Sequence, residues 1–414
     1  MIIINIKGLV QVRSKPPLKV SGSEMAELPI IEDAFLIIKN GIIEDFGRME
    51  EYHEQYADAE DKTEVIDAAG KYVLPGFVDS HTHLVFAAYR EGEFVDKING
   101  LSYAEIAAKG GGILNSARKL QKMGEDALYD VSLPRAWEIL SYGTVAVEIK
   151  SGYGLTPVDE LKMLRVARRI GSETPLKVKT TFLGAHAIPQ DRTREGYIKE
   201  ILEVMIPGIA DEGLADYIDV FCEKGFFTPE ETELIVEEGK KFGMIPKIHA
   251  NQLHISGGVQ VGVKTKARSV DHLESMGQAE IDVLVGSDTM PTLLPGAAFF
   301  LNSSYPPARK MIEAGLPLAI ATDYNPGSAP CGRMSQMLSH ACIKMRMTPE
   351  EAINAITINT AFAMDVSDTH GSITRGKAGS MIITKEIPSL AFIPYAFGSD
   401  IVESVIVEGK KLDF

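Results

Sequence analysis

The chain has 414 residues, of which 45% are hydrophobic, so it can bury a large core and is too long for one small domain. Its formal net charge is −15, from 57 acidic and 42 basic residues, which argues against nucleic acid or an anionic membrane as a partner. A small anionic substrate is still compatible with this charge, because one local arginine can outweigh a distant, screened acidic surface.

The cysteines and the N-terminus bear on the cellular compartment. Cys222, Cys331 and Cys342 form an odd set without paired spacing, which favours neither a disulfide framework nor a cysteine zinc site. The first residues lack the basic start and cleavage site of a signal peptide, and no apolar run approaches the length of a membrane span. We therefore expect a soluble, cytoplasmic protein without membrane contact.

Short β-rich runs occupy both ends of the chain. Near the N-terminus they cover residues 2–6, 34–39 and 42–46, and Asn40-Gly41 is a hairpin-turn signal between the last two. Near the C-terminus they cover residues 379–384, 391–394 and 401–407. Because such short strands cannot bury a face alone, we expect residues 1–72 and 366–414 to pack together as one small β-sandwich domain. The alternative is two separate β appendages.

Residues 73–365 alternate short apolar strands with longer amphipathic helices. Eight strands are predicted, at residues 73–83, 144–150, 176–186, 217–223, 245–249, 268–272, 289–294 and 318–323. Three helices are predicted to start at a capping threonine followed by proline, at Thr156, Thr228 and Thr348. This alternation predicts an α/β fold with a TIM-type (β/α)8 barrel. A doubly wound open sheet is the rival, but it would usually carry a glycine-rich loop after its first strand.

Polar residues stand at the carboxyl ends of the predicted strands, where such barrels carry their catalytic groups. His81 and His83 share one face of the first strand and form half of a divalent-metal site. The later strand ends carry Lys150, His186, Glu223, His249, His272 and Asp323. Any one histidine could be an ordinary core residue, but five of the nine histidines at strand ends favour a shared site.

Three imidazoles and one carboxylate, from His81, His83, His249 and Asp323, suit a Zn or Fe ion and leave a position for water. A bound metal ion can lower the pKa of that water to about 7. Asp323 would then act as ligand and proton carrier, while His272 would polarise the attacked carbonyl. The pattern predicts a hydrolase with one divalent or trivalent metal ion, Zn or Fe, per subunit.

Together, the first-strand motif, His249, His272 and Asp323 resemble the amidohydrolase superfamily of metal-dependent hydrolases and deaminases. Five further segments extend the match, at residues 150–155, 182–187, 247–252, 269–274 and 321–328. They are similar to the branch of the superfamily that opens the cyclic amide of an imidazolone propionate during histidine degradation. The resemblance covers about residues 70–365 by motif and implies a β-sandwich built from both chain ends and a homodimer.

The resemblance also implies contacts with a small-molecule substrate. Arg90 would bind the propionate, for which a guanidinium fork is suited. Tyr153 and His186 would contact the ring or the product. The turn after Asp323 would offer donors to the product from Asn325, Gly327 and Ser328. Without the resemblance, these would be a surface arginine, a turn tyrosine and ordinary turn chemistry.

Two positions depart from patterns within the superfamily. Some members carry Glu where this chain has Gln252, and because Gln cannot titrate, it can only orient the ring here. Proton transfer then falls to Asp323, with His272 assisting. Dinuclear relatives bridge two metals with a modified lysine at the end of the fourth strand, whereas this chain has Glu223 followed by Lys224. One metal ion is therefore our interpretation.

Other functions stay open at the level of sequence. A nucleobase deaminase acting on guanine or cytosine would use the same metal set without a carboxylate clamp. A metal-free scaffold barrel would usually show a broken ligand set, whereas all four ligands are present here. The sequence does not decide whether residues 94–143, which contain Gly110-Gly111-Gly112, form a lid.

Overall fold

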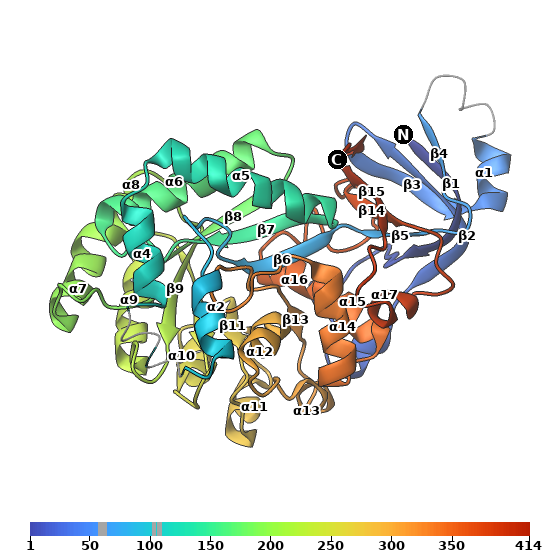
Figure 1. The fold of residues 1–414 in the computed structure, drawn as a ribbon. Coiled ribbons are helices and arrows are strands. Elements are labelled where there is room, and N and C mark those ends of the chain that lie inside the picture. Colours follow the sequence, from blue (N-terminus) through green and yellow to red (C-terminus); the bar gives the residue numbers. More distant parts are fainter. Residues whose placement is uncertain (57–63, 102–104, 106–109) are drawn as a thin grey trace.

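The computed structural model describes residues 1–56, 64–101, 105 and 110–414. Its strands form two separate sheets, one rolled into a barrel and one built from both ends of the chain (Figure 1). This arrangement confirms the predicted α/β fold, with a parallel barrel beside a smaller β unit.

Eight parallel strands follow one another around the barrel in chain order. They are β6 (Phe77–Thr82), β7 (Thr144–Lys150), β8 (Lys177–Ala185), β9 (Tyr217–Cys222), β10 (Ile245–Ala250), β11 (Ser269–His272), β12 (Met290–Leu293) and β13 (Ala319–Ile320). Thr82 forms a parallel bridge with Tyr324, and the Asp323 backbone N–H donates to the His81 carbonyl at 3.0 Å. These bonds nearly close the sheet, which excludes the open doubly wound alternative.

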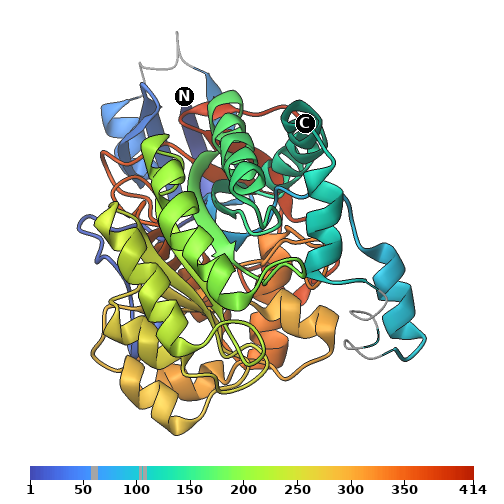
Figure 2. The ribbon, with the colours of Figure 1, turned by 90° about the vertical axis from the view of Figure 1, so that its left-hand side faces the viewer.

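Helices surround the barrel strands (Figure 2). They are α5 (Glu125–Ser141), α6 (Pro157–Glu173), α7 (Arg194–Glu200), α8 (Ile206–Asp211), α9 (Pro229–Lys241), α10 (Gly258–Lys264), α11 (Gln278–Leu284), α12 (Pro295–Leu301), α13 (Ala308–Glu313), α14 (Met334–Met345), α15 (Pro349–Ile356) and α16 (Ile358–Ala363). Thr156, Thr228 and Thr348 cap α6, α9 and α15 as predicted, with a full capping box at the last two. Within the described ranges, no helix is long and apolar enough to cross a bilayer.

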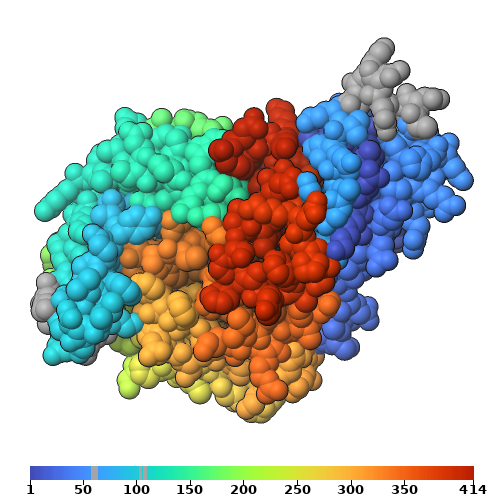
Figure 3. All heavy atoms as spheres, turned by 45° about the vertical axis from the view of Figure 1, so that its right-hand side comes forward, coloured from blue at the N-terminus to red at the C-terminus, as the bar shows by residue number. Residues whose placement is uncertain are grey.

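The second sheet joins the two ends of the chain. Its strands are β1 (Ile2–Val10), β2 (Ile30–Lys39), β3 (Ile42–Arg48), β4 (Val65–Asp67), β5 (Tyr72–Pro75), β14 (Met381–Thr384), β15 (Val402–Val407) and β16 (Lys410–Lys411). Antiparallel pairing of β14 with β5 connects the C-terminal strands to the N-terminal ones, and Figure 3 shows these segments side by side. The predicted packing of both ends is confirmed, in the form of one continuous mixed sheet.

Local turns and small helices complete this unit. Asn40 and Gly41 have φ values of 53° and 80°, which suit the predicted two-residue hairpin turn between β2 and β3. Helix α1 (Met49–Gln55) follows β3, and a 3-10 turn (Gly22–Ala26) interrupts the first long loop. The exact domain boundaries at residues 72/73 and 365/366 stay a prediction.

Two strand predictions were wrong in detail. Residues 73–83 form two strands, β5 and β6, because the chain passes at Gly76 from one sheet to the other; a Cβ there would lie 2.4 Å from Val145 Cγ1. Residues 391–394, predicted as a strand, lie largely in helix α17 (Phe392–Tyr395), which packs on α14. Four apolar residues show no periodicity that separates a strand from a helix, and Pro394 has no N–H for a sheet.

Candidate metal centre and substrate cavity

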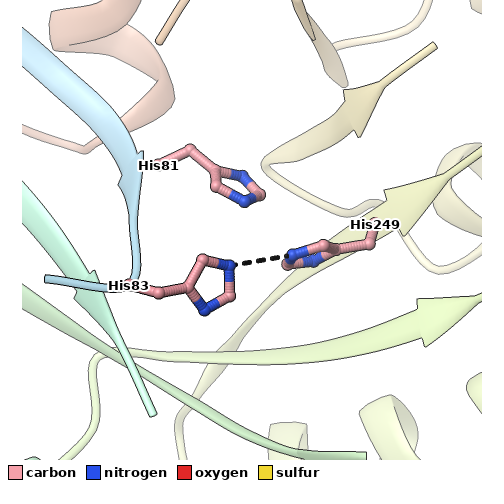
Figure 4. Close-up of side chains that lie close together, drawn as sticks. All are labelled: His81, His83 and His249. Carbon is pink, nitrogen blue, oxygen red and sulfur yellow. Dashed lines mark hydrogen bonds between the residues drawn. The ribbon is translucent and has the colours of Figure 1, made fainter. Parts of the chain in front are cut away.

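The candidate ligand atoms lie at the carboxyl end of the barrel in two groups that share His81: His81, His83 and His249 in one, shown in Figure 4, and His81, His272 and Asp323 in the other. His83 Nε2 lies 3.4 Å from His249 Nε2 and 3.6 Å from Asp323 Oδ1. His81 Nε2 also lies 3.6 Å from that carboxylate oxygen. Donors about 2.0–2.1 Å from a tetrahedral centre are about 3.3–3.4 Å apart, so these spacings fit one shared ion. All four predicted ligand side chains are buried.

Buried carboxylates orient two of these histidines. His81 Nδ1 lies 2.6 Å from Asp271 Oδ2, and His249 Nδ1 lies 2.9 Å from Asp219 Oδ2. Because an ionised carboxylate only accepts hydrogen bonds, Nδ1 carries the ring proton and Nε2 presents its lone pair to the shared position. His81 Nε2 is buried and makes no hydrogen bond within the described residues, as expected for an atom that faces a metal.

The protonation states also suit metal binding. Burial lowers the pKa of His249 to about 4, and burial followed by neighbouring cationic groups holds the pKa values of His81 and His83 well below 6.5. Neutral imidazole is the form that binds a metal. Burial raises the pKa of the Asp323 carboxyl to about 6, and a bound cation would lower it again.

His272 lies beside the ligand histidines, but its pKa is shifted in the opposite direction. Burial is the largest influence and lowers its pKa, but the carboxylates of Glu274, 3.4 Å from His272 Nδ1, and of Asp323 and Asp271 together leave the pKa raised. This imidazole is therefore protonated more readily than the three ligand imidazoles. His272 and Asp323 have φ values of 88° and 56°, in the left-handed region that is uncommon for residues with side chains.

A cavity of about 480 Å³ adjoins this cluster. Its lining contains every substrate-binding residue predicted from the sequence, namely Arg90, Tyr153, His186, Gln252, Asn325, Gly327 and Ser328. Helices α2 (Glu91–Ile98) and α4 (Ile113–Gln121) also contribute to its wall, through Phe94 and Ile113 among others. The possible lid at residues 94–143 includes residues 102–104 and 106–109, which lie outside the described residues.

Arg90 brings a guanidinium to this cavity, and one of its N–H groups has no hydrogen-bond acceptor in the described chain. Its Nε is buried without a hydrogen bond in the described chain, and the Glu93 carboxylate is 3.9 Å away. The guanidinium passes directly over Gly327, where a Cβ would lie 1.1 Å from Arg90 Nη2. A buried guanidinium with a free N–H suits a substrate carboxylate. Gly327 therefore provides the space that this side chain occupies.

The donors of the turn after Asp323 are engaged within the turn itself. Asn325 Oδ1 accepts the backbone N–H groups of Gly327 and Ser328, each at 2.8 Å. Asn325 Nδ2 donates to the Asp323 carbonyl at 2.6 Å, and the Ser328 hydroxyl lies 3.4 Å from Asp323 Oδ2. These contacts orient the Asp323 carboxylate. Donation from this turn to a product stays a prediction.

His186 and Tyr153 form one wall of the cavity. The His186 ring stacks on His83 with centroids 5.2 Å apart, and its Nδ1 lies 3.0 Å from the Gly152 carbonyl, which leaves Nε2 as an acceptor. The buried Glu160 carboxylate accepts three backbone N–H groups from residues 152–155. The loop that carries Tyr153 is therefore tightly held.

Glu223 positions the loop on the opposite wall. Its buried carboxylate accepts the backbone N–H groups of Leu253 at 2.9 Å and His254 at 3.3 Å. The preceding residue, Gln252, is half-buried at the cavity. Lys224 is exposed and thus does not occupy the position of a metal-bridging lysine.

Four buried charged residues lie beneath the ligands and were not predicted as site residues from the sequence; they are Glu148, Asp219, Lys247 and Asp271. Barrel interiors are usually filled by branched apolar side chains. Charged residues at alternate positions of apolar strands, such as Glu148 and Lys150 on β7, were the available signal.

The fold and the cluster together define a barrel protein with a candidate metal site at its catalytic end. The sequence profile of the amidohydrolase family matches residues 72–412. The chain therefore belongs to the amidohydrolase family and, as its relatives show, to the imidazolonepropionases within it. It is 56% identical to the imidazolonepropionase of Flavobacterium johnsoniae over 99% of both chains. It is 54% identical to that of Christiangramia forsetii over 100% of both.

Solved structures of other enzymes share the fold. Guanine deaminase from E. coli has a TM-score of 0.74 at 16% identity, over 100% of this chain and 98% of that one. A zinc-containing adenosine deaminase from Xanthomonas campestris has a TM-score of 0.69 at 16% identity, over 99% and 92% of the two chains. At such low identity, the likeness concerns the fold alone.

We expect the purified chain to bind close to one equivalent of Zn²⁺ at neutral pH. His249→Ala should bind less than about a tenth of that, because one of the few metal–protein bonds is lost. His254→Ala, on the loop just after β10 but exposed, should bind as the wild type does. Metal analysis after gel filtration measures this, and full zinc occupancy in His249→Ala would contradict the ligand set.

Proposed function

We propose that this imidazolonepropionase hydrolyses the cyclic amide C–N bond of 4-imidazolone-5-propanoate to N-formimidoyl-L-glutamate. One Zn or Fe ion would be held by His81, His83, His249 and Asp323. The observation that carries the proposal is the grouping of the His81, His83 and His249 nitrogens, with Asp323 Oδ1 3.6 Å from two of them, beside a cavity that also holds Arg90, whose Nε makes no hydrogen bond in the described chain.

The protein's own residues position the substrate. The Arg90 guanidinium binds the propionate through charge-assisted hydrogen bonds, and this contact places the ring carbonyl near the metal ligands. His186 accepts a ring N–H through Nε2, Tyr153 packs beside it, and Gln252 orients the ring. Both Zn and Fe are compatible with three imidazoles and one carboxylate.

When bound, the ion supplies a Lewis acid that polarises a carbonyl and lowers the pKa of water to about 7. Asp323 accepts a proton from the attacking water and passes it to the ring nitrogen as the C–N bond breaks. His272 donates a hydrogen bond to the carbonyl oxygen as negative charge develops there. One water is consumed, the carbonyl carbon becomes a carboxylate, and the nitrogen stays with the formimidoyl group.

The proposal includes a cytoplasmic homodimer. Cys222, Cys331 and Cys342 are all unpaired, which suits a reducing compartment. The homodimer rests on the resemblance to the family. Size measurement in solution tests it.

A spectrophotometric assay of ring opening tests the reaction. The wild type should turn over 4-imidazolone-5-propanoate, lose activity on chelation, and release no ammonia from guanine or cytosine. Asp323→Asn should lower kcat by about 10²–10⁴-fold, because Asn cannot accept the proton. The exposed Asp282→Asn is the matched control and should keep full activity. Near-wild-type turnover by a folded Asp323→Asn would reject the role of this residue, and deamination without ring opening would reject the reaction.

Gly327→Ala should weaken substrate binding without unfolding the protein. The new Cβ would overlap Arg90 Nη2, so the flexible guanidinium must move away from its place in the cavity. We expect KM to rise by about tenfold or more, which corresponds to about 1.4 kcal/mol of lost binding. Gly92→Ala is the matched control, because a Cβ at this neighbour of Arg90 meets nothing within 4 Å. An unchanged KM in Gly327→Ala would contradict the assignment of Arg90.

A further inference from the structure

A layer of five buried charged side chains lies inside the barrel beneath the metal position. They are Glu148 and Lys150 on β7, Asp219 on β9, Lys247 on β10 and Asp271 on β11. Their mutual contacts pair three carboxylates with two ammonium groups, away from water. The layer therefore has a defined pattern of contacts, in which the two lysines differ.

Lys150 contacts the carboxylate oxygens that orient the metal-facing histidines. Its Nζ lies 2.9 Å from Asp219 Oδ2 and 3.8 Å from Asp271 Oδ2. These are the same two oxygen atoms that accept the Nδ1 protons of His249 and His81. The Lys150 ammonium group thus contacts the carboxylate partners of two of the three ligand imidazoles.

Lys247 is equally buried but makes different contacts. Its Nζ donates to the Glu148 carboxylate and to the Ser80 carbonyl, the latter at 2.9 Å. Among the described residues, it forms no ion pair with Asp219 or Asp271. The charge of Lys247 also acts on Asp271, so the comparison rests on the direct hydrogen bond to Asp219 Oδ2, which Lys150 makes and Lys247 does not within the described residues.

We propose that Lys150 is a positioning residue for the metal centre, because its ammonium group donates a hydrogen bond to the Asp219 oxygen that orients His249 and forms an ion pair with the Asp271 oxygen that orients His81. The inference rests on the proposed metal site but not on the proposed substrate. Two carboxylates without this cation between them repel each other and can rotate away from the histidines. In a buried site of low dielectric, that repulsion is poorly screened. Each imidazole would then lose the partner that determines which ring nitrogen faces the ion.

The test compares Lys150→Met with Lys247→Met in zinc affinity, measured by competition with a chromophoric chelator. Removing the direct partner of a metal ligand typically weakens metal binding by about 10–100-fold; because Lys150 acts through two such partners, we expect a loss of about tenfold for Lys150→Met. We expect less than about a threefold loss for Lys247→Met, since both histidine–carboxylate pairs remain intact. Both variants lose one buried cation, so both should lose thermal stability to a similar extent.

A second measurement distinguishes a change in ligand geometry from a general loss of stability. With Co²⁺ in place of zinc, the visible absorption spectrum of Lys150→Met should change, because the spectrum reports ligand geometry, while that of Lys247→Met should match the wild type. Wild-type zinc affinity and cobalt spectrum in Lys150→Met would overturn the inference. An equal loss of affinity in both variants would also overturn it, because the effect would then be one of buried charge alone.

A second substitution at Lys150 and nitrogen NMR of the wild type test the inference if Lys150→Met does not fold. If Lys150→Met does not fold, Lys150→Gln keeps a donor that reaches only one carboxylate, and it should weaken zinc binding in the same direction. Nitrogen NMR of the metal-free wild type should show His81 and His249 with the proton fixed on Nδ1, and averaged tautomers would overturn the inference. A wild type that binds no zinc would reject the metal site itself, which distinguishes that failure from the failure of Lys150.

Discussion

The carboxylates of Asp219 and Asp271 hold the Nδ1 atoms of two histidines, so that Nε2 of each faces the proposed metal position. An imidazole can present either nitrogen, and only a fixed partner on one of them determines which is free for an ion. Burying two carboxylates is unfavourable unless cations compensate them. The charged layer with Lys150 at its centre therefore follows from the need to orient histidines inside a dry barrel.

The loops around the cavity are also held by buried carboxylates, which accept hydrogen bonds from backbone N–H groups. Glu160 fixes the loop of Tyr153, and Glu223 fixes the loop after β10 that carries Gln252. The turn after Asp323 has two roles. Its Asn325 and Ser328 side chains hold the turn and the Asp323 carboxylate, while Gly327 leaves space for Arg90. A rigid set of strand-end loops thus positions both the metal ligands and the carboxylate-binding group.

Part of this could be predicted from the sequence. The barrel, and the meeting of the candidate ligands, follow from apolar strands of which several end in His or Asp, because strand ends of a parallel barrel meet at one face. The break between β5 and β6 could not be predicted, since only the approach of Val145 to Gly76 reveals it. The roles of Asp219 and Asp271 were also hidden, because they depend on which histidine lies across the barrel. The same holds for Gly327, whose function is the absence of a side chain beside Arg90.

Anomalous diffraction from crystals of the zinc-loaded enzyme tests the central claim most directly. The account predicts one zinc peak per chain, about 2.0–2.2 Å from Nε2 of His81, His83 and His249 and from a carboxylate oxygen of Asp323. It also predicts that Asp219 and Asp271 stay bonded to the two Nδ1 atoms. A zinc ion bound through Nδ1, or held by His81, His272 and Asp323 with His83 and His249 unbound, would contradict it.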